Sequence, residues 1–116
     1  MKLKDICCEL DINYEENISR FAGNENIYIK FLKRFLEDNT YNNLKQAYSQ
    51  KSYEDIEKYA HMLKGVAANL GINRIFLLSN EIVQNVRQKE FNKIDNLYDK
   101  LVKEYELTIQ MIENIE

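Results

Sequence analysis

Apolar residues along the chain recur mostly at steps of three and four, which is the spacing of one face of an α-helix. The clearest stripe begins after residue 91 and consists of Ile94, Leu97, Leu101, Tyr105, Thr108, Ile112 and Ile115. Proline is absent and glycine occurs only three times. Because proline breaks helix interiors and glycine commonly ends helices, such a chain can be mostly continuous helix.

Capping residues divide this pattern into six expected helices. Asparagine or serine stands at the expected starts, and glycine follows two of the expected ends. The starts are Asn13, Asn24, Ser52 and Asn73, and the ends are Gly23 and Gly71. The helices are expected at residues 3–11, 13–23, 25–49, 52–71, 74–88 and 91–116.

Four of these helices are long and amphipathic, and the loops between them have only a few residues. This pattern favours an all-α fold, an antiparallel up-and-down four-helix bundle with one or two short N-terminal helices closing one end. The chain of 116 residues fits a single domain over 1–116, with the core bundle over about residues 24–115. Met1 and the small size favour a free-standing protein over a domain cut from a larger kinase.

Composition and charge narrow the range of partners. The formal net charge is -3 and the basic residues are dispersed, so we expect no nucleic acid partner. No apolar run approaches the length of about 20 residues that a membrane-spanning helix needs. The two cysteines, Cys7 and Cys8, are adjacent and have no other cysteine to pair with. Free thiols suit a reducing compartment, so we expect a cytoplasmic protein.

The expected helix at 52–71 carries the only histidine, His61. Its apolar residues gather on one side, namely Ile56, Tyr59, Ala60, Leu63, Ala67 and Leu70. On a helical wheel His61 lies about 160° from the centre of that stripe, so its imidazole should face solvent. Lys64 at i+3 and Gly65 at i+4 should lie beside it. Glycine costs about 1 kcal/mol relative to alanine in a helix interior, so Gly65 suggests that space beside His61 is needed.

A neutral, exposed imidazole can act as a nucleophile toward a phosphoryl group. Phosphoryl transfer asks a protein mainly for positioning and charge stabilisation, and Lys64 is placed to offset the added negative charge. The plain alternative is a solvated surface histidine with no chemical role. A di-iron bundle would need two Glu-x-x-His pairs, which one histidine does not supply. No Gly-rich phosphate loop is present, so autonomous kinase activity is not expected.

The stretch from Ala60 to Gly71, AHMLKGVAANLG, resembles the signature of histidine phosphotransfer (HPt) domains. The segments NYEE from Asn13, RFAGN from Arg20, and Tyr28 to Asp38 resemble the region that usually precedes this signature. The resemblance therefore covers nearly the whole chain.

The resemblance implies that His61 is phosphorylated, through Nε2, that Lys64 assists the phosphoryl group, and that Gly65 gives the partner access. It implies a phosphorelay carrier without kinase activity of its own. Such a carrier accepts phosphate from a receiver aspartate of a hybrid sensor kinase and passes it to a response-regulator aspartate. We expect a monomer with no cofactor of its own, because Mg²⁺ belongs to the receiver partner. The alternative is an HPt-like helical module that docks receivers without being phosphorylated.

Two features near His61 remain open at this point. Several family members have a Gln or Glu on the next helix that hydrogen-bonds the histidine, and the equivalent position here is Val83. Gln84 or Asn80 replaces it, or water orients the imidazole. On that helix the expected core stripe is Ile75, Leu78, Ile82 and Val86. Phe76 and Val83 lie off this stripe and either form an apolar docking patch near His61 or fill the groove between the two helices. The sequence does not identify the kinase, the regulator or the pathway.

Overall fold

The computed structural model describes all residues, 1–116, and contains helices and no strands. The helices are α1 (Leu3–Glu9), α2 (Tyr14–Arg20), α3 (Glu25–Phe35), α4 (Thr40–Ser49), α5 (Tyr53–Leu70), α6 (Asn73–Arg87), a 3₁₀ turn η1 (Phe91–Lys93) and α7 (Ile94–Glu113). The predicted all-α fold is therefore confirmed. None of the helices is both long and apolar enough to cross a bilayer.

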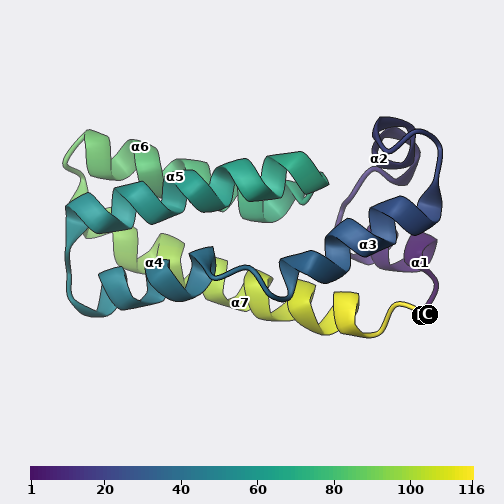
Figure 1. Cartoon of the computed structure of the whole chain (residues 1–116). Helices are drawn as coiled ribbons and strands as arrows, with labels where there is room; N and C mark the ends of the chain where they lie inside the picture. Colours follow the sequence, from purple (N-terminus) through teal and green to yellow (C-terminus); the bar gives the residue numbers. More distant parts are fainter.

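Helices α4, α5, α6 and α7 form an antiparallel up-and-down bundle, and α5 packs most extensively on α6 (Figure 1). Helix α3 continues along the C-terminal half of α7, and the short helices α1 and α2 lie at that same end. The two termini meet there, because the Glu116 amide donates to the Met1 carbonyl at 3.1 Å. The N-terminal helices thus extend one end of the bundle.

A single cluster of 28 buried apolar residues runs through the molecule and includes side chains of α1 as well as the bundle. Every member of the stripe predicted for the last helix is buried, from Ile94 to Ile115. Helix α5 buries Ile56, Ala60, Leu63, Ala67 and Leu70, while Tyr59 is half-buried. The periodic positions therefore identified the core faces of α5 and α7 correctly.

The long helix predicted over 25–49 is wrong, because the chain breaks between α3 and α4. At the break the Thr40 amide donates to Asp38 Oδ1 at 2.8 Å. Asp and Asn side chains compete with helical hydrogen bonds in this way, and Asn39 follows directly. Within α3 the buried residues are Tyr28, Leu32 and Phe35, and the periodic residues Ile27 and Phe31 are exposed.

Stacked aromatic rings join α4 to α7 along the side of the bundle opposite α5 and α6. The rings of Tyr41 and Tyr105 lie 3.7 Å apart between centroids, as do those of Tyr48 and Tyr98. Burial raises the pKa of Tyr41 and of Tyr105 to about 12. These stacked rings hold α4 and α7 together on the side of the bundle that does not carry α5 and α6.

Candidate functional site

Helix α5 holds His61 on its solvent face. The helix ends at Gly71, which adopts the left-handed conformation with φ 72°. The Ile72 amide donates to the Ala67 carbonyl at 2.9 Å and closes the last turn. Because Ala60 and Leu63 are buried toward the bundle, His61 points outward and is exposed. The helical wheel therefore placed this side chain correctly.

Lys64 lies one turn along α5 and is half-buried. Its ammonium lies 5.9 Å from the centroid of the Phe76 ring on α6, within the range of a cation–π contact. It forms none of the ion pairs in the molecule. The positive charge of Lys64 thus lies near an aromatic ring and has no carboxylate partner.

Gly65 lies at i+4 from His61, in the helix interior. A Cβ atom built on Gly65 would meet no atom within 4 Å, apart from the glycine's own immediate helix surroundings. Packing within the protein therefore does not require glycine here. Glycine costs about 1 kcal/mol relative to alanine at such a position, and the space beside the imidazole is open.

Glu57 lies at i-4 from His61, and its carboxylate is engaged. Arg87 Nε on α6 lies 3.4 Å from Glu57 Oε2, so the pair bridges α5 and α6. Exposed pairs contribute little to stability, but this one offsets a negative charge next to the imidazole. Sequence reasoning missed Arg87, although the antiparallel register across the turn at Gly71 places residue 87 opposite residue 57.

The second helix of the site differs from the prediction in its core. Val83 is completely buried, which decides between the two alternatives that the sequence left open: it fills the groove between α5 and α6 and does not belong to a docking patch. Ser79 is also buried, whereas the predicted core residue Leu78 is only half-buried. Phe76 is half-buried. The core stripe of α6 is therefore rotated toward α5.

Asn80 and Gln84 were the candidates for orienting His61. Both are half-buried on α6, and neither hydrogen-bonds the imidazole. The side-chain amide of the next residue, Asn85, donates to the Glu81 carbonyl at 2.8 Å. The structure therefore gives no hydrogen bond by which Asn80 or Gln84 would orient the imidazole.

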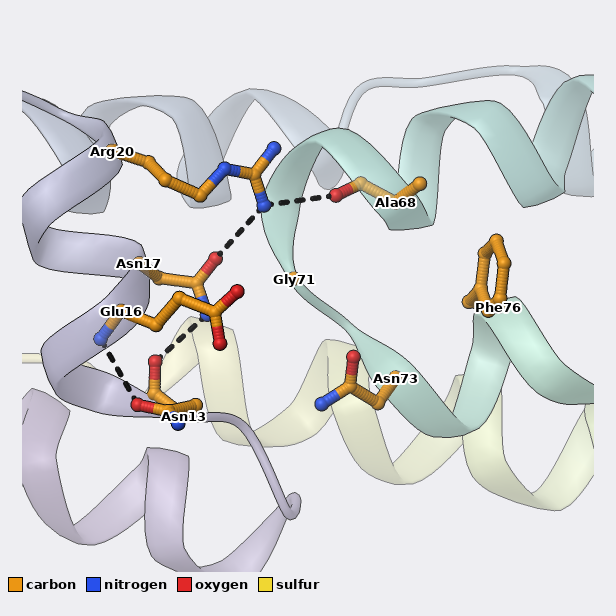
Figure 2. A pocket seen from close by; sticks show the side chains of 8 residues that line it. All are labelled: Asn13, Glu16, Asn17, Arg20, Ala68, Gly71, Asn73 and Phe76. Atoms are coloured by element: carbon orange, nitrogen blue, oxygen red, sulfur yellow. Dashed lines mark hydrogen bonds between the residues drawn. The ribbon is translucent and has the colours of Figure 1, made fainter.

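The end of α5 is clamped by helix α2 (Figure 2). Arg20 donates to the Ala68 carbonyl at 3.3 Å and to the Asn69 carbonyl at 3.5 Å, and it also reaches Asn17 Oδ1 at 3.4 Å. The Ala68 carbonyl also accepts the Gly71 amide, and a guanidinium at a helix C-terminus complements the helix dipole. Asn17 is buried against Gly71, where a Cβ would lie only 2.1 Å from the amide oxygen.

A cleft of about 170 Å³ remains between α2 and the turn joining α5 to α6. Its lining residues are Asn13, Glu16, Asn17, Arg20, Ala68, Gly71, Asn73 and Phe76. Asn13 caps α2 as predicted, by accepting the Glu16 amide. Asn73 does not cap α6 as predicted; its amide donates to the Asp11 carbonyl at 3.2 Å. The sequence did not indicate this cleft, because it depends on how α2 docks.

The chain contains no group of three or more His, Cys, Asp or Glu side chains arranged to share a metal ion. In comparisons with known proteins, the family described as Hpt domain matches residues 30–114 of the 116-residue chain. This match runs from within α3 to the end of α7 and includes all of α5 and α6. No curated protein and no solved structure matched the chain.

Proposed function

The chain belongs to the Hpt domain family, and on that basis we propose that it carries a phosphoryl group on His61 between two receiver domains. Membership of the family gives a histidine phosphotransfer role in two-component signalling. The specific proposal is that phosphate arrives from a receiver aspartate of a hybrid sensor kinase. It then leaves to the aspartate of a response regulator.

One observation carries this proposal: His61 is an exposed imidazole with a cation at i+3 and empty space at i+4. A receiver must bring a phosphorylated aspartate within bonding distance of a ring nitrogen. Bulky side chains around the imidazole would prevent that approach. The bare backbone at Gly65 and the small Ala68 farther along the same face leave room for it.

The transfer step exchanges one bond to phosphorus for another. The lone pair of His61 Nε2 attacks phosphorus, the bond from phosphorus to the aspartyl oxygen breaks, and the receiver recovers its carboxylate. At that moment the proton of the imidazole lies on Nδ1. The second transfer runs the same exchange in reverse, toward the aspartate of the next receiver. Positioning and charge compensation supply most of the catalysis in such reactions.

Lys64 is assigned to charge compensation. It is the i+3 neighbour of His61 on one helix face, and no carboxylate competes for its charge. The Phe76 ring beneath it limits the freedom of the side chain. The Glu57–Arg87 pair, at the other end of the site, keeps a free carboxylate away from the incoming phosphate.

The partners supply what the chain does not. Mg²⁺ is assigned to the receiver, and this chain acts as a monomeric carrier without kinase activity. Because receivers and kinase domains of such relays act in the cytoplasm, the cytoplasm is the proposed location.

The test is phosphotransfer from a receiver charged with acetyl phosphate. Wild-type protein should acquire an acid-labile, alkali-stable phosphoryl group and pass it to a second receiver, tested over a panel of receivers. His61→Gln should acquire none while binding receivers with similar affinity. Binding without any labelling of the wild type would instead establish a docking module that is not phosphorylated.

A further inference from the structure

We propose that the groove between α6 and α7 is a second docking surface, separate from His61, and that it binds an acidic amphipathic helix of a partner protein. The groove has a volume of about 450 Å³. Its lining residues are Arg74, Leu77 and Leu78 of α6 and Lys100, Lys103 and Glu104 of α7. Its exposed leucines, its unpaired lysines and its position relative to the imidazole indicate this occupant.

Two leucines form the apolar part of the groove. Leu77 is the most exposed large apolar side chain of the chain, at 57%, and Leu78 beside it is half-buried. Leu107, which follows Lys103 by one turn on α7, is also exposed. Clustered exposed apolar side chains mark interaction sites, and a groove between two helices fits the apolar face of an amphipathic helix.

An ion pair joins the two walls of the groove. Arg74 Nη1 on α6 lies 3.4 Å from Glu104 Oε1 on α7, and the same nitrogen donates to the Glu9 carbonyl of α1 at 3.3 Å. Arg74 and Glu104 therefore neutralise each other, and their contacts connect three helices at this end of the groove. A surface held in this way loses little conformational entropy when a partner binds.

The remaining charges of the groove are the two lysines on its α7 edge. Lys100 and Lys103 are exposed, and neither forms an ion pair within the chain. The exposed acids on the same stretch of α7, Asp99 and Glu106, line the groove toward α4, which Lys103 also borders. The groove is thus cationic on a chain whose formal net charge is -3, and carboxylates of a partner helix would complement it.

Helix α6 separates this groove from His61. Helix α5 packs on α4 and α6, and α6 packs on α7 in turn (Figure 1). The α5 side of α6 carries Arg87, which pairs with Glu57, whereas the α7 side carries Arg74, which pairs with Glu104. A partner helix seated between α6 and α7 therefore leaves the imidazole open to a receiver.

Charge and size disfavour two other occupants. A second copy docked by two-fold symmetry would present the same groove on both sides of the interface, and so bring lysines toward lysines. An anionic membrane would gain only about 1 kcal/mol per lysine and would take up few apolar side chains here. A separate helix with leucines on one face and carboxylates beside them matches both features of the groove.

The test uses two synthetic helical peptides labelled with fluorescein. Both carry leucines at i, i+3, i+4 and i+7, which span about 10 Å of helix, the length of α7 from Lys100 to Leu107. The flanking residues are glutamates in the acidic peptide and lysines in the basic one. Fluorescence anisotropy gives the Kd for wild-type protein and for Lys100→Glu/Lys103→Glu. The control is Lys30→Glu/Lys89→Glu, which changes the net charge equally at exposed, unpaired lysines elsewhere.

Wild-type protein should bind the acidic peptide about tenfold more tightly than the basic one, and Lys100→Glu/Lys103→Glu should reverse this order. The control variant should keep the wild-type Kd for both peptides within about twofold. Leu77→Ser should weaken the acidic peptide about tenfold, because it removes the most exposed apolar contact of the groove. Thermal melts should show that all these variants are folded.

Three results would overturn the proposal. They are no binding of the acidic peptide to wild-type protein, an unchanged preference in Lys100→Glu/Lys103→Glu, and binding only to vesicles that contain anionic lipid. Saturating acidic peptide should also leave phosphotransfer to His61 unchanged, and competition with the receiver would contradict the separation of the two surfaces. Loss of phosphotransfer without peptide would concern the proposed function alone.

Discussion

Replacing Gly65 by alanine should make the isolated protein more stable and, at the same time, a poorer phosphoryl acceptor. The added methyl group meets no atom within 4 Å in the free protein, so it introduces no internal clash. It projects at i+4 from His61, where Cβ atoms on a helix are about 5–6 Å apart. The methyl group would therefore occupy the space through which we propose that the receiver approaches.

The two effects have opposite signs and separate magnitudes. In an exposed helix interior alanine is favoured over glycine by about 1 kcal/mol. For a domain of this size that gain raises the melting temperature by about 4 °C. Crowding a well-fitted contact costs about 1–3 kcal/mol, so the transfer rate should fall by roughly tenfold or more.

The assay pairs urea unfolding with single-turnover transfer from a charged receiver. Gly65→Gln extends the series, because a longer side chain should slow transfer further without destabilising the helix. Asn69→Ala is the control, since Asn69 is exposed on the same helix but eight residues from His61. It should stabilise α5 slightly and leave the transfer rate unchanged.

Two results would refute this reasoning. A loss of stability in Gly65→Ala would mean that the space at i+4 is not empty in the free protein. Unchanged transfer in both Gly65 variants would mean that the receiver does not approach over this turn of α5. Either outcome would remove the assigned role of Gly65.

Three further predictions concern Lys64, Gly71 and the two cysteines of α1. Lys64→Ala should slow transfer about tenfold, because it removes the charge beside the phosphoryl group. It should cost at most about 1 kcal/mol of stability, from the lost contact with Phe76. The control is Lys30→Ala, at an exposed position on α3, and equal transfer rates for the two variants would contradict this prediction. Gly71→Ala should lower the free energy of unfolding, measured in urea, by about 2–3 kcal/mol, because φ is 72° and the new Cβ would lie 2.1 Å from Asn17. A change below about 0.5 kcal/mol would count against the clamp by α2. At pH 8 a thiol reagent should label exposed Cys8 and spare Cys7, whose pKa burial raises from 9.0 to about 11. Labelling of both thiols at equal rates in the native protein would contradict this prediction. Because the unfolded chain loses the Cys7 proton at lower pH than the folded chain, the free energy of unfolding should also fall as the pH rises above 9.

The sequence predicted those parts of the fold that depend on position along one helix. The stripe from Ile94 to Ile115 and the outward direction of His61 follow from helical periodicity alone, and both agree with the structure. The break between α3 and α4 was missed because it depends on one competing hydrogen bond from Asp38. Periodic apolar residues on both sides of the break hid it.

The features that depend on contacts between helices were harder to predict from the sequence. Val83 was an open case, and only the close packing of α5 on α6 decides that it is buried. The Arg87 partner of Glu57 and the cleft beside α2 likewise need a register between elements far apart in the chain. For the candidate site, the sequence located His61, its exposure and its two helical neighbours but not the surface around them.

The most direct test of the central claim uses the fact that the chain has a single histidine. Protein labelled with ¹⁵N at histidine shows the signals of one imidazole, which can be followed by NMR while a charged receiver and Mg²⁺ are added. We predict that the Nε2 signal moves to a new, phosphorus-coupled position and returns when a second, uncharged receiver is supplied. An unchanged imidazole spectrum, in the presence of a receiver that demonstrably binds, would contradict it.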